Sequence, residues 1–357
     1  MQAIRDLVLR RFPGRTIVSC ARLGDDEQRD DATTKGSGYG VPVRVVMRDA
    51  AGREEAVVFH TARADDFGHD RRADRAAQML LAFDTYGLVP RHVPALDVGV
   101  ITRGGELRSL ADADETYLLT GWQPGELYAQ DLRRIAATGA TARDHQRLDA
   151  LADYLAQLHH RDGARTALYT RAVRDLIGSG EGVFGMIDGY ARDVPGASAV
   201  RLRRLEESCA AWRWRLRGRE PRAARIHGDF HPFNILFTGD AELALLDASR
   251  GAIGEAADDV TALAINFVFF ALDTPGAWHR GLGPLWHRLW SRYALTTNDH
   301  ELLEVAAPWL AWRALVIANP RWYPNLSTDG RDRLLTWIER ALDAPRLEPR
   351  SADEVAR

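Results

Sequence analysis

The feature that most constrains this chain is the stretch RIHGDFHPFNILF at residues 225–237, which sets four polar side chains between two short apolar runs. Three interpretations are open. His227, Asp229 and His231 alternate, so on an extended strand they would point to one side as the ligands of a metal hydrolase. An Asp followed by an Asn also suits the catalytic loop of an enzyme that transfers phosphoryl groups. The third interpretation is a polar turn between two strands.

The residues that follow favour the second interpretation. Asp247 closes the apolar run ELALL, so the pattern becomes H-G-D-x-x-x-x-N, a hairpin, and L-L-D. Mg²⁺ takes hard oxygen ligands and usually only one or two from the protein, which Asn234 and Asp247 would supply from the two ends of the hairpin. Asp229 is then left to accept the proton of an attacking hydroxyl. Gly228 and Pro232 interrupt the strand on which the metal-hydrolase interpretation depends, and no further His or Cys cluster completes such a site.

A known family carries the same pattern. HGDFHPFNILF followed by LLDASRGAIGEAADDV closely resembles the kinase-like phosphotransferases typified by aminoglycoside phosphotransferases and choline kinases. YLLTGWQPGELY resembles the hinge of that family, and LADYLAQLHHRDG resembles its long helix ending in Leu-His. The resemblance implies an α+β, bilobal, protein-kinase-like fold with a small β-rich N-terminal lobe, a larger and mostly helical C-terminal lobe, and the nucleotide in the cleft.

The resemblance also implies roles for individual residues. Asp229 corresponds to the catalytic base of the family, and Asn234 and Asp247 correspond to its metal ligands. Asp259, in the pair Asp259-Val260, corresponds to an Asp that is usually structural. The implied activity is Mg²⁺-dependent transfer of the γ-phosphoryl group of ATP or GTP to a hydroxyl of a small molecule.

A second triplet, His160-Arg161-Asp162, spells the catalytic motif of eukaryotic protein kinases. It ends a predicted helix far before the hairpin and lacks an Asn at the required distance, so we interpret it as a solvated helix terminus. We expect His227 to pack and hydrogen-bond beneath the loop rather than to do chemistry.

Periodicity divides the chain into parts of different character. Residues 1–120 are predicted to form a β-rich nucleotide-binding lobe, with a short helix at 1–12 and strands at 16–23, 41–48, 55–62, 96–102 and 116–121. One longer helix is predicted at 70–86, with its apolar residues spaced for one buried face. Residues 121–127 read as a hinge, and 128–344 as a helical lobe carrying the catalytic loop, the metal hairpin and the acceptor site. Its helices are expected at 128–137, 142–160, 166–177, 196–216, 257–272, 277–294, 299–318 and 328–343. The charged tail at 345–357 is expected to fray.

The nucleotide side departs from the family. A kinase-like site has a Lys on the third strand, paired with a helix Glu, whereas here the matching residues are His60 and Asp74, with Arg63 a weaker alternative to His60. A neutral-pH histidine is only partly charged, which leaves a non-catalytic, nucleotide-binding pseudokinase as the alternative function. Lys35 is the only lysine of the chain and opens KGSGYG. The backbone of Gly36, Gly38 and Gly40 can approach phosphates closely, so Lys35 either supplies the missing charge or is a solvated loop residue.

The sequence does not identify the acceptor or the residues that bind it. An aromatic box could bind a quaternary ammonium by cation–π contact, although helical spacing places most of these rings more simply in the core: Trp278, Trp286, Trp290, Trp309, Trp312, Trp322 and Tyr323. Arg250 could contact an anion, or pair with Glu255 or Asp258. An acidic pocket for an amine could form from Asp175, Glu181 and Asp188.

Composition narrows the partners and the compartment. With 47 basic and 50 acidic residues the net charge is −3, which offers no basic field to nucleic acid. No apolar run is long enough for a membrane span, the first residues are too charged for a signal peptide, and Cys20 and Cys209 read as reduced thiols. We expect a cytoplasmic monomer or homodimer.

Overall fold

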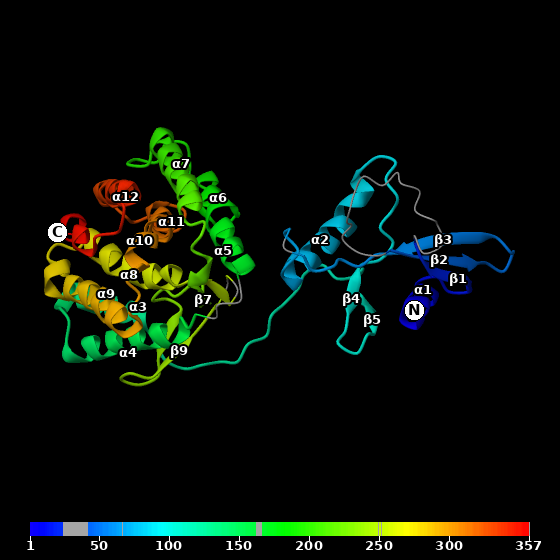
Figure 1. Cartoon of the computed structure of the whole chain (residues 1–357), viewed down its shortest axis with the longest axis horizontal. Helices are drawn as coiled ribbons and strands as arrows, with labels where there is room; N and C mark the ends of the chain where they lie inside the picture. The colour runs from blue at the N-terminus through cyan, green and yellow to red at the C-terminus, as the bar shows by residue number, and fades with distance from the viewer. Residues whose placement is uncertain (24–41, 66, 162–165, 249, 251, 357) are drawn as a thin grey trace. The chain divides into compact units, whose positions relative to one another are not determined.

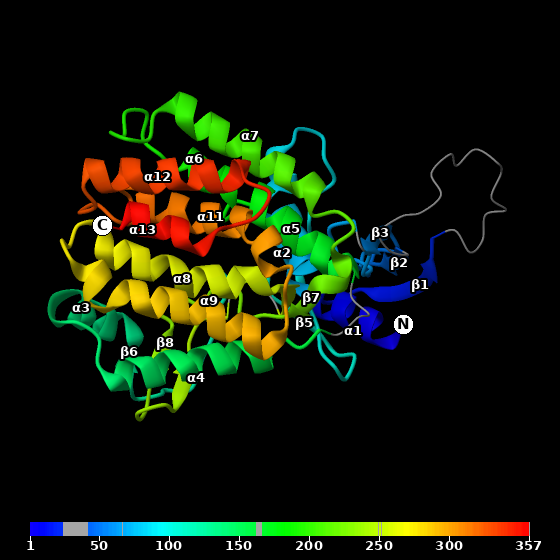
Figure 2. The same ribbon diagram turned by 60° about the vertical axis from the view of Figure 1, so that its left-hand side comes forward.

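The computed structural model describes residues 1–23, 42–65, 67–161, 166–248, 250 and 252–356. They form two compact units, Met1–Thr120 and Gly121–Arg357, each with its own hydrophobic core. Figures 1 and 2 label most of the helices and strands named below. The mixture of small antiparallel sheets and many helices confirms the expected α+β class.

The first unit is built on a three-stranded antiparallel sheet in the order β1-β2-β3. The central strand β2 (Val43–Arg48) lies between β1 (Thr16–Arg22) and β3 (Glu54–Phe59), and helix α1 (Gln2–Arg11) contributes Val8 to the core beneath the sheet. The rest of this unit comprises α2 (Arg72–Thr85), the short helix η1 (Tyr86–Leu88) and the hairpin β4 (Gly99–Ile101) and β5 (Leu107–Ser109).

Two expectations for this unit are wrong. Residues 116–121 form no strand, because a β-like composition does not supply a neighbouring strand for its backbone hydrogen bonds. Among the described residues, none of the α2 side chains is buried, so the apolar spacing of this helix does not produce the expected buried face.

The second unit is a layered helical body. Figure 2 shows α12, α11, α8, α9 and α4 side by side as successive layers. Helix α8 (Ala256–Leu272) is buried along almost its whole length, as its apolar sequence requires. The other helices up to residue 343 are α3 (Tyr128–Thr138), α4 (Ala142–Leu158), α5 (Thr166–Gly178), α6 (Val183–Asp188), α7 (Ala199–Arg215), η2 (Glu220–Arg222), η3 (Trp278–Leu282), α9 (Gly283–Thr297), α10 (Leu302–Val305), α11 (Ala307–Ala318) and α12 (Thr328–Asp343).

Two small antiparallel sheets hold the motif stretch in this unit. One is ordered β6-β8-β9, with β6 (Glu126–Leu127), β8 (Ile235–Phe237) and β9 (Leu243–Leu245); the other pairs β7 (Ala223–Arg225) with β10 (Ile253–Glu255). Residues 226–234 therefore form the loop that leads from one small sheet into the other.

The C-terminal residues pack against the helical body instead of fraying. Leu347 is 1% exposed and Val355 6% exposed, and the segment forms η4 (Pro349–Ser351) and α13 (Ala352–Val355). The Asp353 carboxylate accepts a 2.8 Å hydrogen bond from the indole nitrogen of Trp278. The spaced apolar side chains of this charged segment pack it against the helical body.

None of the described helices is long and apolar enough to cross a membrane.

Candidate active site

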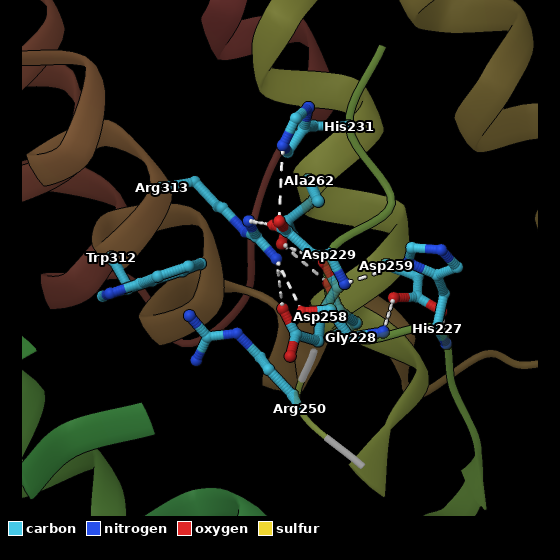
Figure 3. A network of polar contacts seen from close by, with 12 residues as sticks. His227, Gly228, Asp229, His231, Arg250, Asp258, Asp259, Ala262, Trp312 and Arg313 are labelled. Carbon is cyan, nitrogen blue, oxygen red and sulfur yellow. Dashed lines mark hydrogen bonds and ion pairs between the residues drawn. The ribbon is translucent and has the colours of Figure 1, made fainter. Parts of the chain in front are cut away.

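The loop at 226–234 is anchored from below by Asp259, in the first turn of α8. Its carboxylate accepts hydrogen bonds from the backbone N–H groups of His227 at 2.7 Å and Gly228 at 2.8 Å. The same carboxylate lies 3.1 Å from Nε2 of His159, whose Nδ1 is 2.8 Å from the Tyr293 hydroxyl. Asp259 is fully buried, so these bonds compensate for the cost of burying its charge. The expected structural role of Asp259 thus has a concrete geometry (Figure 3).

Gly228 is required by the shape of the loop. Its φ of +83° lies in the left-handed region that favours glycine. A Cβ atom at this position would also lie 2.6 Å from Cβ of Arg250. Any other residue would therefore move either the loop or the segment that carries Arg250.

Asp229 lies in this anchored loop, and a quarter of its side chain is exposed. Oδ1 is 2.5 Å from Nη1 of Arg313, and Oδ2 is 3.3 Å from Nε2 of His231 and 3.1 Å from Nδ2 of Asn234. Burial raises the pKa of Asp229, but the hydrogen bond from His231 and the charge of Arg313 outweigh it and lower that pKa below its ordinary value. The Asp229 carboxylate is therefore held in one orientation and favoured in its ionised form.

Arg313, on α11, is a site residue that the sequence alone did not indicate. Its Nη2 donates to Asp258 Oδ1 at 2.9 Å and lies 3.3 Å from the carbonyl oxygen of Gly228. Burial raises the pKa of Asp258 in spite of the neighbouring Arg313 charge. The indole ring of Trp312 lies 4.1 Å from the guanidinium carbon of Arg313 and 3.8 Å from that of Arg250. Trp312 thus belongs to the site and not merely to the core.

Asn234 and Asp247 flank the same end of the β8–β9 hairpin, in which Ile235 pairs with Leu245. The backbone N–H of Leu246 donates to the carbonyl of Asn234 at 2.9 Å, which places Asp247 directly beyond this pair. The Asn234 amide nitrogen donates to the backbone carbonyl and to the carboxylate of Asp229, each at 3.1 Å. Its amide oxygen therefore stays available as an acceptor. Asp247 is exposed and adopts a φ of +53°, uncommon for a residue with a side chain.

This donor set fits Mg²⁺. An amide oxygen and a carboxylate are the hard oxygen ligands that Mg²⁺ accepts from proteins, with phosphates and waters completing its shell. Among the residues that the structure describes, no group of three His, Cys, Asp or Glu is arranged to hold a metal ion.

His227 is buried, its Nδ1 accepts a 3.2 Å hydrogen bond from the Asp229 backbone, and its ring packs edge-on against Phe230. It packs beneath the loop as expected.

Only two of the residues predicted to bind the nucleotide, His60 and Asp74, lie in the described part of the chain. Lys35, Gly36, Gly38 and Gly40 lie outside the described residues. His60 follows β3 and is exposed, and Asp74 accepts a 2.8 Å hydrogen bond from the Arg71 backbone at the start of α2. Both belong to the first compact unit, whereas Asp229, Asn234 and Asp247 all belong to the second.

The residues considered for binding the acceptor differ in their burial and in their partners. Of the aromatic residues considered for a box, the buried ones are Trp278, Trp286, Trp290, Trp309 and Trp312. Trp322 is 55% exposed, and Tyr323 is partly buried and packs against the core. The Glu255 carboxylate binds Arg222 at 2.7 Å. Arg171 donates a hydrogen bond of 2.7 Å to the Asp175 carboxylate, so this acid already has a cationic partner within the chain.

Of the triplet His160-Arg161-Asp162, the structure describes the first two residues. His160 is exposed. Arg161 forms an ion pair of 2.9 Å with Asp299. Asp162 lies outside the described residues.

This arrangement of loop and hairpin agrees with the one expected of a kinase-like phosphotransferase, and residues 36–296 match the sequence profile of the phosphotransferase enzyme family. The chain belongs to this family, which confirms the resemblance drawn from the motifs. A search of curated proteins gives no match.

Several solved structures are similar to the chain at low sequence identity. An ethanolamine kinase from Plasmodium vivax is 11% identical over 88% of this chain and 78% of its own, with a TM-score of 0.35. A glucosamine kinase in complex with glucosamine, ADP and inorganic phosphate is 16% identical over 94% and 96% of the two chains, with a TM-score of 0.34. A macrolide 2'-phosphotransferase type I is 16% identical over 96% of both chains, with a TM-score of 0.29.

Proposed function

We propose that this protein transfers the γ-phosphoryl group of ATP or GTP to a hydroxyl of a small molecule, with Asp229 as the proton acceptor. The observation that carries the proposal is the position of the Asp229 carboxylate, held by Arg313 on one oxygen and joined through Asn234 to the end of the hairpin that carries Asp247. A carboxylate oxygen has more than one lone pair, so Asp229 retains capacity for the hydroxyl proton of the acceptor.

The chemistry asked of the chain is positioning and charge stabilisation. The acceptor oxygen forms a bond to the γ-phosphorus, the bond to the leaving nucleoside diphosphate breaks, and the acceptor proton passes to Asp229. Asn234 and Asp247 would hold Mg²⁺, which neutralises charge on the phosphates. Orientation within an ordered loop is the main contribution of the protein to the rate.

On the nucleotide side, we propose that the two compact units are the lobes of a kinase-like enzyme and that the first binds the nucleotide. Lys35 would supply the phosphate-binding charge that His60 provides only in part, with the backbone of residues 36–40 covering the phosphates. Nucleotide affinity of Lys35→Ala and His60→Ala tests this assignment. An unchanged affinity of Lys35→Ala would remove Lys35 from it.

The function is tested by Mg²⁺-dependent release of nucleoside diphosphate in the presence of aminoglycosides, amino alcohols, sugars and nucleosides. Asp229→Asn should lower the acceptor-dependent rate by about 10²–10⁴-fold, and its melting temperature is recorded because the change also removes a negative partner of the buried Arg313. Asp153→Asn is the matched control, because Asp153 is also paired with an arginine, Arg292, at 2.5 Å, but lies on α4. Nucleotide binding without turnover on any acceptor would instead support the pseudokinase alternative.

A further inference from the structure

We propose that Arg313 is a positioning residue that fixes the Asp229 carboxylate and selects Oδ2 as the oxygen that accepts the proton. This inference rests on the proposed function, because it concerns the orientation of the proposed base. Arg313 would act through Asp229 without touching the acceptor or the nucleotide.

The first argument is the way Arg313 holds the loop. Its Nη1 binds Asp229 Oδ1 at 2.5 Å, while Nη2 lies 3.3 Å from the carbonyl oxygen of the preceding residue, Gly228. One planar guanidinium therefore contacts both the side chain and the backbone of the loop tip. A lysine ammonium, a single point donor, cannot reproduce such a fork.

The second argument is that Arg313 is itself immobilised. Its side chain is 8% exposed, and Nη2 binds Asp258 Oδ1 at 2.9 Å in the first turn of α8. Its guanidinium carbon lies 4.1 Å from the Trp312 ring, and the Trp312 nitrogen donates to the Glu181 carbonyl at 2.9 Å. Figure 3 shows Arg313 and Arg250 on either side of this indole. A clamp that is fixed in this way transmits a fixed orientation to Asp229.

The third argument concerns the two Asp229 oxygens. Oδ1 accepts from Arg313 on α11, whereas Oδ2 accepts from the Asn234 amide nitrogen at 3.1 Å and lies 3.3 Å from Nε2 of His231. Oδ2 is therefore the oxygen on the side of the metal hairpin, where the phosphoryl group would be held. A carboxylate free to rotate would present this oxygen only part of the time, and a misplacement of about 1 Å can cost about 100-fold in rate.

A double-mutant cycle tests the inference. Nucleoside-diphosphate release from Mg²⁺–ATP is measured for wild type, Arg313→Gln, Asp229→Asn and the double variant. We expect Arg313→Gln to lower kcat by about 100-fold with little change in the KM for ATP, and to cause no further loss when Asp229 is already Asn. Arg313→Lys should lie between wild type and Arg313→Gln, because it keeps the charge and loses the fork.

Arg331→Gln is the matched control. Arg331 is a buried arginine on α12 that donates to the backbone carbonyls of Ala318 at 2.8 Å and Pro195 at 3.0 Å. Its loss should lower the melting temperature without lowering kcat, and any effect on rate should multiply with that of Asp229→Asn. The melting temperature of every variant is recorded, and Arg313→Lys replaces Arg313→Gln in the cycle if the latter does not fold.

The outcomes separate the two proposals. Losses that multiply in the double variant, or an Arg313→Gln enzyme with wild-type kcat, would overturn the positioning role of Arg313. Wild-type turnover by Asp229→Asn would instead overturn Asp229 as the base, and with it the proposed function.

Discussion

The Asp259 carboxylate on α8 accepts a hydrogen bond of 2.7 Å from the backbone N–H of His227, at the start of the loop that carries Asp229. A second bond of 2.8 Å from Gly228 makes this a two-point attachment. A helix that is buried along almost its whole length therefore holds the backbone of the candidate catalytic loop, so the position of Asp229 depends on the helical core.

Replacing Asp259 by Asn should loosen this attachment. An Asn amide presents N–H groups toward buried N–H groups of the backbone, and a buried donor without a partner costs about 1–3 kcal/mol. We expect a lower free energy of unfolding together with a lower kcat, measured by urea unfolding and by nucleoside-diphosphate release. Asp273→Asn is the control, because Asp273 also accepts from a backbone N–H, that of Ser327 at 2.7 Å, but in an exposed position. Equal effects of the two variants on kcat would contradict the anchoring role.

The metal-ligand assignment predicts a changed magnesium requirement. Asn234→Ala and Asp247→Asn should each raise the Mg²⁺ concentration for half-maximal turnover by about 10-fold or more, since Mg²⁺ draws only one or two ligands from a protein. A magnesium titration of turnover measures this shift. Asp240→Asn changes a carboxylate of the same hairpin that instead lies 3.2 Å from Arg143, and should leave the titration unchanged. Superimposable titrations for all variants would exclude Asn234 and Asp247 as ligands.

Gly228→Ala separates backbone strain from steric clash. Alanine at a positive φ costs about 1–2 kcal/mol, and here the new Cβ would also meet Arg250 at 2.6 Å. Gly218 has a similar φ of +88°, and a Cβ atom added there would meet nothing within 4 Å, so Gly218→Ala isolates the strain. We expect both variants to lose stability in urea unfolding, but only Gly228→Ala to lose most of its turnover. Comparable turnover would show that the close approach to Arg250 has no effect on the loop.

Acid should weaken the buried ion pair between Asp299 and Arg222. Burial raises the pKa of Asp299, but two hydrogen bonds from Arg222, at 2.7 and 2.9 Å, outweigh it and hold the pKa below the ordinary 3.8. A lowered folded-state pKa contributes stability that is complete above the unfolded value and is lost as the pH falls through the folded one. The stability difference between wild type and Asp299→Asn should therefore be large at about pH 7 and shrink below about pH 4.

Urea midpoints of both proteins at the two pH values check this window. Asp329→Asn, at a side chain that is 79% exposed, should show a small difference at either pH. A difference for Asp299→Asn that does not change with pH would mean that the ion pair adds no pH-dependent stability.

The candidate site was predictable where its parts are close in sequence. Asn234 and Asp247 flank one short hairpin, so the pattern of apolar and polar residues is enough to bring them together. The helices with regular apolar spacing were predictable for the same reason. Pro308 shows the limit, because it lies at the start of α11 and divides a region that was expected to be a single helix at 299–318.

The partner of Asp229 was not predictable from the sequence. Arg313 lies 84 positions from Asp229 in the chain, within an apolar helix whose pattern indicates only a core position. The bond between His159 and Asp259 spans 100 positions.

The sequence by itself determined the family, the α+β class and the local geometry of the loop and hairpin, because these follow from short-range spacing. Only the tertiary structure decided which charge faces Asp229, because that depends on how α8 and α11 pack, and helix packing is not encoded in any single segment.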